Sequence, residues 1–104
     1  MYKPIYILEY DNAKDQERFE KYIEFIREEW LPYVNKLQED GVCKRSAFAD
    51  NTGHIIGIYE FDDLEAFSKV WNDDKWQQLM IRYGQMVDNA RTRLCRPSMI
   101  IGTS

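Results

Sequence analysis

Two stretches of the chain are apolar on both of their alternating faces, and they predict the architecture. Residues Lys3 to Tyr10 and residues His54 to Phe61 are rich in β-branched and aromatic side chains, which favour strands. A strand with apolar residues on both faces has to be covered on both sides. The pattern therefore predicts that these two strands lie in the centre of one sheet.

Two further stretches are expected to form edge strands. Val42 to Ala49 is less apolar and carries three polar residues in its middle, which discourages unwanted pairing at a sheet edge. Cys95 to Ile101 is the expected fourth strand, in which Pro97 marks an edge or a bulge. The sequence DNTG at residues 50–53 predicts a hairpin turn between the second and third strands.

Two helical segments separate the strands. Apolar side chains recur at three- and four-residue steps from Asp15 to Gln38, which is typical of a helix with one buried face. Pro32 lies inside this pattern. Because proline removes a backbone donor and clashes with the preceding turn, we expect a kink just before it or two abutting helices. The second helical segment begins at Asp63, is interrupted at residues 72–74 and continues to about Arg91.

The predicted order is β-α-β-β-α-β, the ferredoxin-like motif of an α+β protein. Right-handed crossovers place both helical segments on one face of a four-stranded antiparallel sheet, and the first and third strands become central. We expect one such domain over residues 1–104. Since the helices cover one face only, the other apolar face needs a cover, and a homodimer that packs sheet on sheet is the simplest one.

The composition narrows the class of protein. A formal net charge of -4 argues against nucleic acid or an anionic membrane as a partner. No apolar run approaches the roughly 20 residues of a membrane span, and the N-terminus does not resemble a signal peptide, so a cytoplasmic location is expected. Cys43 and Cys95 are interpreted as small buried apolar residues. Aromatic residues make up 14% of the chain, which calls for a large interior, a pocket or an interface.

Short motifs spread over nearly the whole chain carry a family resemblance. They are IY at residues 5–6 before a helix with Phe19, IYEFDDLE at 58–65, DKWQ at 74–77 and RLCRP at 93–97. By these motifs the chain resembles the NIPSNAP-like family of the dimeric α/β-barrel superfamily, which is related to antibiotic biosynthesis monooxygenase-type domains. The resemblance implies that two ferredoxin-like subunits close a barrel through their sheets. It also implies small-ligand chemistry of the cofactor-independent monooxygenase, haem-degrading or isomerase kind.

The chain departs from that family at places where a functional side chain would matter. Gly57 stands where the family often has a histidine in the third strand, and Tyr59 stands where a tryptophan follows it. Residues 11–14, DNAK, replace a Pro-Gly pair before the first helix. Roles that those side chains have elsewhere are therefore not carried over to this chain.

His54 is the only histidine and the only candidate catalytic residue. Its imidazole suits a general base near neutral pH or a haem ligand. The alternative is a partly exposed residue at the start of a strand. No second histidine or cysteine stands at metal-ligand spacing, so no metal site is expected, and no cofactor is predicted.

Aromatic residues supply the candidate ligand-binding site. Four of them are predicted to contact a ligand, with packing in the core or the dimer interface as the alternative: Tyr6, Tyr59, Trp71 and Trp76. Tyr6, Tyr10 and Tyr59, together with Gly57, are expected to border a cavity between sheet and helices. The basic residues of the two predicted edges are candidates to recognise a carboxylate, or else are solvated edge charges: Lys44, Arg45, Arg93 and Arg96.

Two functional hypotheses follow. The first is a protein that binds a small hydrophobic or planar organic compound and, if it is an enzyme, is a monooxygenase-like or haem-degrading-like oxidoreductase. The second is a non-catalytic dimeric interaction module, since no serine–histidine–acid pattern, phosphate loop or dinucleotide fingerprint is present.

Overall fold

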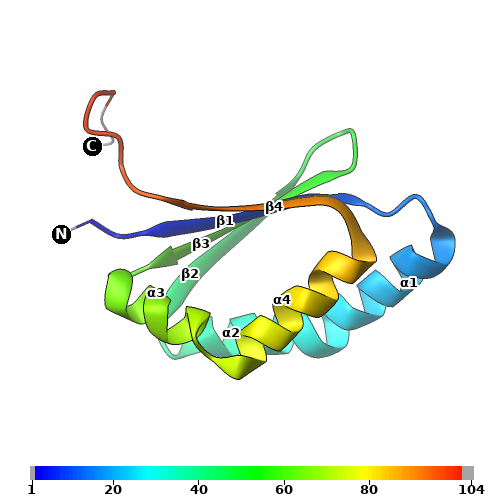
Figure 1. Ribbon diagram of the computed structural model, residues 1–104, viewed down its shortest axis with the longest axis horizontal. Helices are drawn as coiled ribbons and strands as arrows, with labels where there is room; N and C mark the ends of the chain where they lie inside the picture. The colour runs from blue at the N-terminus through cyan, green and yellow to red at the C-terminus, as the bar shows by residue number, and fades with distance from the viewer. Residues whose placement is uncertain (1, 102–104) are drawn as a thin grey trace.

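The computed structural model describes residues 2–101 and shows a four-stranded antiparallel sheet whose helices all pack on one face (Figure 1). The strand order is β2-β3-β1-β4, so β1 and β3 are central, as predicted. The elements are β1 (Ile5–Asn12), α1 (Gln16–Phe25), the π-helical turn η1 (Ile26–Trp30), α2 (Leu31–Glu39), β2 (Cys43–Ala49), β3 (His54–Phe61), α3 (Leu64–Trp71), α4 (Asp74–Met86) and β4 (Val87–Cys95). The predicted ferredoxin-like order is confirmed.

The two faces of the sheet differ in cover. Tyr6 of β1 stands opposite Tyr59 of β3, and both side chains are buried beneath the helices. On the other face, Ile7 of β1 stands opposite Ile58 of β3, and both are partly exposed. We call this second side the open face. Its apolar surface also includes Phe48 of β2, which is 58% exposed.

The proline in the first helical segment changes the type of helix. Pro32 lies in the first turn of α2 and has no N–H to give to the residue four positions before it. The preceding turn, η1, is wider than an α-helix, and the Leu31 N–H bonds to the carbonyl of Ile26 five residues earlier. The expected interruption is thus present as a π-helical turn, and Trp30 at its end is buried in the core.

The end of the second helical segment was predicted wrongly. The helix was expected to continue to about Arg91, but α4 ends at Met86, and β4 occupies Val87–Cys95 in place of the predicted strand at 95–101. Tyr83, Val87 and Ala90 continue the three- and four-residue spacing of the helix. The hydrophobic pattern therefore does not indicate that a strand begins at Val87. The register between β1 and β4 also shifts next to Asn89, whose positive φ of 54° interrupts the alternation.

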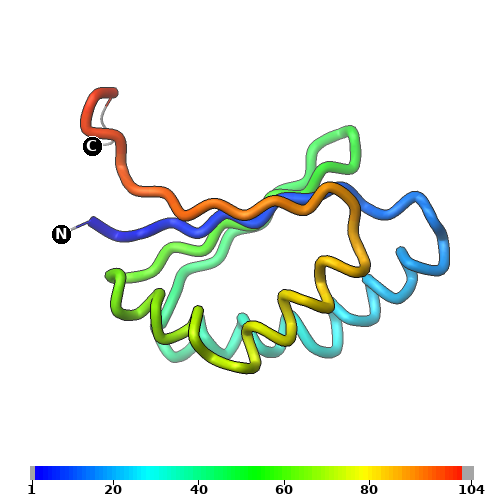
Figure 2. Tube along the Cα trace, in the orientation of Figure 1, coloured from blue at the N-terminus to red at the C-terminus, as the bar shows by residue number. Residues whose placement is uncertain are grey.

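The segment after β4 leaves the sheet on the side away from the helices. Figures 1 and 2 show residues 96–101 rising from the sheet there. Met99, Ile100 and Ile101 are almost fully exposed, so this segment adds apolar surface on the side of the open face. Within residues 2–101, none of the helices has the length and apolar character needed to cross a bilayer.

Candidate functional site

A cavity of about 180 Å³ lies between the sheet and the helices. It is lined by β1, β2 and β3 on one side and by α1, η1, α2 and α4 on the other. An apolar cavity of about 150 Å³ is large enough to hold benzene, so this one suits a single aromatic ring with a small substituent. The residues that carry its chemistry are Tyr10, Tyr22, Trp30, Arg45, Tyr59 and Tyr83.

Three tyrosine hydroxyls meet at one end of the cavity. The Tyr10 hydroxyl lies 2.5 Å from that of Tyr22 and 2.6 Å from that of Tyr83. The Tyr10 ring meets the other two edge to face, with centroids 5.7 Å and 5.1 Å away. Burial raises the pKa of all three hydroxyls, so each keeps its proton across the physiological range. We call these residues the tyrosine trio.

Tyr59 lies further along the same cavity. Its hydroxyl accepts a hydrogen bond of 3.2 Å from Trp30 Nε1, and burial raises its pKa to about 12. Its ring approaches Gly57, where a Cβ atom would come within 3.2 Å of Tyr59 Cε2. Gly57 therefore allows the Tyr59 ring to lie close to the strand backbone, as a glycine in the middle of a strand predicted.

Arg45 is the charged residue of the cavity wall. It stands opposite Tyr59 in the β2–β3 register and is partly buried. Its Nη2 donates to Asn35 Oδ1 at 3.3 Å, while its Nε is buried and has no hydrogen-bond partner among the described residues. From the sequence, Arg45 was a candidate to recognise a carboxylate or else a solvated edge charge. The alternation of Cys43, Arg45 and Ala47 is the signal that points its side chain toward the helices.

The predicted ligand-binding aromatics come together, but only one of them lines the cavity. Tyr6 has ring centroids of Trp71 and Trp76 at 5.9 Å and 5.6 Å, and that of Tyr59 at 6.3 Å. Of these, Tyr59 alone faces the cavity. Tyr6 and Trp76 are buried among aromatic rings, which agrees with the core alternative, and Trp71 is 39% exposed. A ligand role for the three stays a prediction.

His54 lies across the sheet from the cavity. On the open face its Nδ1 is 2.8 Å from Asp11 Oδ1 and its Nε2 is 3.1 Å from Glu9 Oε1. Both ring nitrogens can donate only in the imidazolium form, and Asp11 and then Glu9 raise the pKa of His54. A catalytic role for His54 stays a prediction, and this position gives it no access to a ligand in the cavity.

Glu9 is the centre of a polar network on the open face. Its side chain is covered by its neighbours: Arg91 donates to it at 3.3 Å, and Arg93 also pairs with it, so the residue is only 6% exposed. The hydrogen bond from His54, followed by those two arginines, lowers the pKa of Glu9. Asn89 donates to Asp11 at 2.9 Å, and this bond, with the one from His54, lowers the pKa of Asp11.

This network predicts a pH-dependent stability. The folded-state pKa of His54 is raised, so its contribution is complete below about pH 6.5 and is lost as the pH rises through the raised value. The pKa values of Glu9 and Asp11 are lowered, so their contributions are complete above about pH 4.5 and are lost as the pH falls through the lowered values. The network therefore contributes most between about pH 4.5 and 6.5.

The variant His54→Gln tests this assignment by thermal melting. We expect the wild type to exceed the variant in melting temperature most clearly near pH 5.5, with the difference shrinking as the pH rises above neutral. A difference that stays constant or grows with rising pH would contradict the imidazolium assignment.

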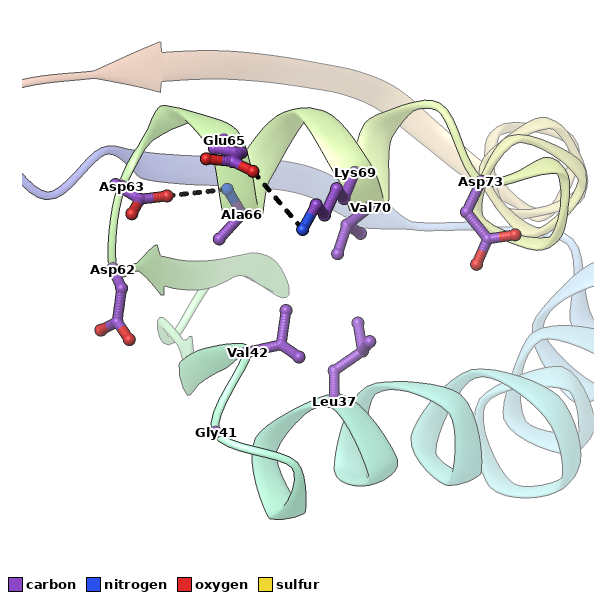
Figure 3. Close-up of a pocket in the computed structure, with 10 residues that line it drawn as sticks. All are labelled: Leu37, Gly41, Val42, Asp62, Asp63, Glu65, Ala66, Lys69, Val70 and Asp73. Atoms are coloured by element: carbon purple, nitrogen blue, oxygen red, sulfur yellow. Dashed lines mark hydrogen bonds and ion pairs between the residues drawn. The ribbon is translucent and has the colours of Figure 1, made fainter.

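A larger hollow, of about 460 Å³, lies on the surface between α2 and α3 (Figure 3). Its floor is apolar, and its rim carries acidic residues together with Lys69, which pairs with Glu65. Asp63 caps α3 by accepting from the Ala66 N–H at 2.8 Å, and Asp73 accepts from the Lys75 N–H at 3.1 Å. The residues that line the smaller cavity include a buried polar atom without a hydrogen-bond partner among the described residues, which is available for a ligand. We therefore take the smaller cavity as the candidate site.

The candidate site does not fit a haem. Across residues 2–101, no three His, Cys, Asp or Glu side chains gather as a metal site would require. A porphyrin consists of four pyrrole rings and does not fit a cavity of about 180 Å³, and His54 is on the opposite side of the sheet. The haem option that the resemblance implied is therefore not compatible with this site.

Comparison with known proteins identifies the fold. No protein-family model and no curated protein matches the sequence. A crystal structure of an antibiotic biosynthesis monooxygenase superposes with a TM-score of 0.64 at 17% identity, covering 88% of this chain and 95% of that one. A NIPSNAP family protein from Agrobacterium tumefaciens strain C58 gives a TM-score of 0.59 at 16% identity, over 94% of this chain and 88% of that one.

A third similar structure is a dimeric ferredoxin-like protein from an uncultured marine organism. It gives a TM-score of 0.68 at 12% identity, over 94% of this chain and 90% of that one. At such identities the likeness is one of fold. The chain therefore has the ferredoxin-like fold that NIPSNAP and antibiotic biosynthesis monooxygenase structures share, as its motifs predicted.

Proposed function

We propose that the protein binds a small planar organic molecule, about one aromatic ring in size, in the cavity between the sheet and the helices. The observation that carries this proposal is the aromatic lining with its convergent polar atoms, namely the tyrosine trio, the Tyr59 hydroxyl and the unpartnered Arg45 Nε. Apolar walls with a few placed polar groups are the usual form of a small-molecule site.

Blocking the mouth of the cavity tests the proposal. Ala47 is exposed on β2 and lines the cavity, so the larger side chain of Ala47→Phe would occupy the space of the ligand. Ala49→Phe is the matched control, because Ala49 lies two residues along on the same side of β2, is also exposed and does not line the cavity.

The measurement is thermal stabilisation by single-ring probes, namely benzoate, benzyl alcohol and hydroquinone. A ligand at a hundred times its dissociation constant adds about 2.7 kcal/mol to the stability of the native state, which shifts the melting temperature of a chain this size by several degrees. We expect stabilisation of the wild type and of Ala49→Phe and none of Ala47→Phe. Absence of stabilisation by all three probes, or an unchanged response of Ala47→Phe, would refute the proposal.

The monooxygenase-type activity implied by the resemblance stays a prediction. Fold likeness does not establish chemistry, because one fold hosts many activities. Oxygen consumption by the wild type on addition of hydroquinone, absent in Ala47→Phe, is the expected sign of such an activity in this cavity.

We also propose a homodimer that buries the open face, which would suffice for the alternative function of a non-catalytic interaction module. The supporting observations are the partly exposed isoleucines on both central strands, Phe48 beside them and the exposed Met99–Ile101 on the same side. Exposed apolar residues gathered on one face of a protein are typical of an interface. The fold likeness to a dimeric ferredoxin-like protein agrees with this arrangement.

A further inference from the structure

Several hydrogen-bond donors at the cavity between sheet and helices have no acceptor within residues 2–101. The tyrosine trio holds three hydroxyl protons, but its members make only two hydrogen bonds with one another, both through Tyr10. Since burial keeps all three phenols protonated, at least one O–H has no acceptor within the trio. Each hydroxyl supplies a single donor, so this excess does not depend on how the protons are arranged.

Two more donors belong to residues that line the cavity. The Tyr59 oxygen accepts from Trp30, and no group in the described part of the chain accepts the Tyr59 proton in return. The Arg45 Nε–H is buried without a partner, while the hydrogen bond from its Nη2 to Asn35 holds the guanidinium in place. Buried donors left without acceptors are unfavourable, so an occupant that accepts these bonds would be favoured.

The cavity wall offers these donors no charged acceptor. Its lining contains no Asp, Glu or His side chain, and Arg45 is its only charged residue. The carboxylates of the open-face network lie on the other side of the sheet. The site is therefore positively charged and rich in donors, which is complementary to an anion with acceptor oxygens.

The strand register separates Arg45 from the tyrosine trio by one inward-facing level of the sheet. Arg45 pairs with Tyr59, the next inward-facing level contains Ala47, Gly57 and Leu8, and the level after that contains Tyr10. The Tyr59 ring lies against Gly57, so the room at the middle level lies toward Ala47, which is small, exposed and part of the cavity lining.

We propose that the ligand is an aryl carboxylate, a single aromatic ring that lies beside Ala47 in the cavity and directs its carboxylate to Arg45. This inference rests on the proposed function and adds the chemical class of the ligand. A carboxylate accepts several hydrogen bonds, and its bond to a guanidinium is charge-assisted. A hydroxyl or carbonyl on the far side of the ring would accept the remaining proton of the tyrosine trio.

The first test compares probes of nearly equal shape on the wild-type protein. Benzoate, benzamide and benzyl alcohol each carry one ring, but only benzoate is an anion at neutral pH. We expect calorimetry or ligand-detected NMR to show benzoate binding at least about tenfold more tightly than either neutral probe, because hydrogen bonds to charged groups are the stronger ones. This comparison needs no variant and does not depend on whether a variant folds.

The second test removes one positive charge at a time, first from the helix-facing side of β2 and then from its opposite side. Arg45→Gln should weaken benzoate binding by about tenfold to a hundredfold and leave benzyl alcohol binding nearly unchanged. Lys44→Gln is the matched control, because it removes the same charge from the neighbouring residue, which is exposed and points to the opposite face. It should leave benzoate binding unchanged.

The outcomes separate this inference from the proposed function. If the neutral probes bind as tightly as benzoate, or if Arg45→Gln and Lys44→Gln behave alike, the aryl carboxylate is refuted while a planar-ligand site stands. If none of the probes binds to the wild type, both proposals fail.

Discussion

Replacing Trp76 by alanine is expected to lower the free energy of unfolding by about 3–5 kcal/mol. The Trp76 side chain is 1% exposed, and its ring lies against those of Trp30, Tyr6 and Tyr59 at centroid distances of 5.4, 5.6 and 6.3 Å. Truncation would leave a large cavity between the sheet and α4, because rings held from several elements at once cannot all move in to fill it.

Trp71→Ala is the matched control, because Trp71 flanks the same break between α3 and α4 but is 39% exposed. Its loss should be nearer to about 1–2 kcal/mol, since part of its apolar surface remains in water in the folded state. Urea denaturation at one fixed protein concentration measures both variants. Equal losses of unfolding free energy would show that the buried packing of Trp76 contributes no more to stability than the half-exposed Trp71 does.

Replacing Ile58 by aspartate is expected to convert the proposed dimer into a folded monomer. Ile58 stands opposite Ile7 of β1 and Ser46 of β2 on the open face, so a second copy would cover it. An unpaired carboxylate in such an interface costs several kcal/mol, and two-fold symmetry introduces it twice. The dissociation constant should therefore rise by at least about a hundredfold.

The matched control is Ile81→Asp, which makes the same change at a residue of α4 that is 64% exposed and on the helix side. Sedimentation velocity at micromolar concentration should show a dimer for the wild type and the control, and a monomer for Ile58→Asp. A wild type that sediments as a monomer would refute the covered open face. A dimer of the Ile58→Asp variant would place the interface elsewhere.

Local patterns were sufficient to predict most of the elements. β1 and β3 were predicted as central from their two apolar faces, and the interruption before Pro32 follows from the chemistry of proline alone. β4 was not predictable in this way. Its residues are mostly polar and exposed, and what makes it a strand is the backbone of β1 beside it.

The candidate site was only partly predictable for the same reason. The expectation of a cavity bordered by Tyr10, Tyr59 and Gly57 agrees with the structure, while Tyr6 lies outside its lining. The role of Arg45 depends on the face it occupies, which a one-residue change in strand register would reverse.

The sequence by itself determined the features that neighbouring residues control: the alternation of the central strands, the apolar stripes of the helices and the hairpin turn. The tertiary structure alone decided which distant side chains meet. Tyr10 and Tyr83 are separated by 73 residues and Glu9 and His54 by 45, yet each pair is in hydrogen-bond contact. The pairing of β1 with its two neighbours and the packing of α4 set those distances, because hydrogen bonding depends on position in space and not on separation along the chain.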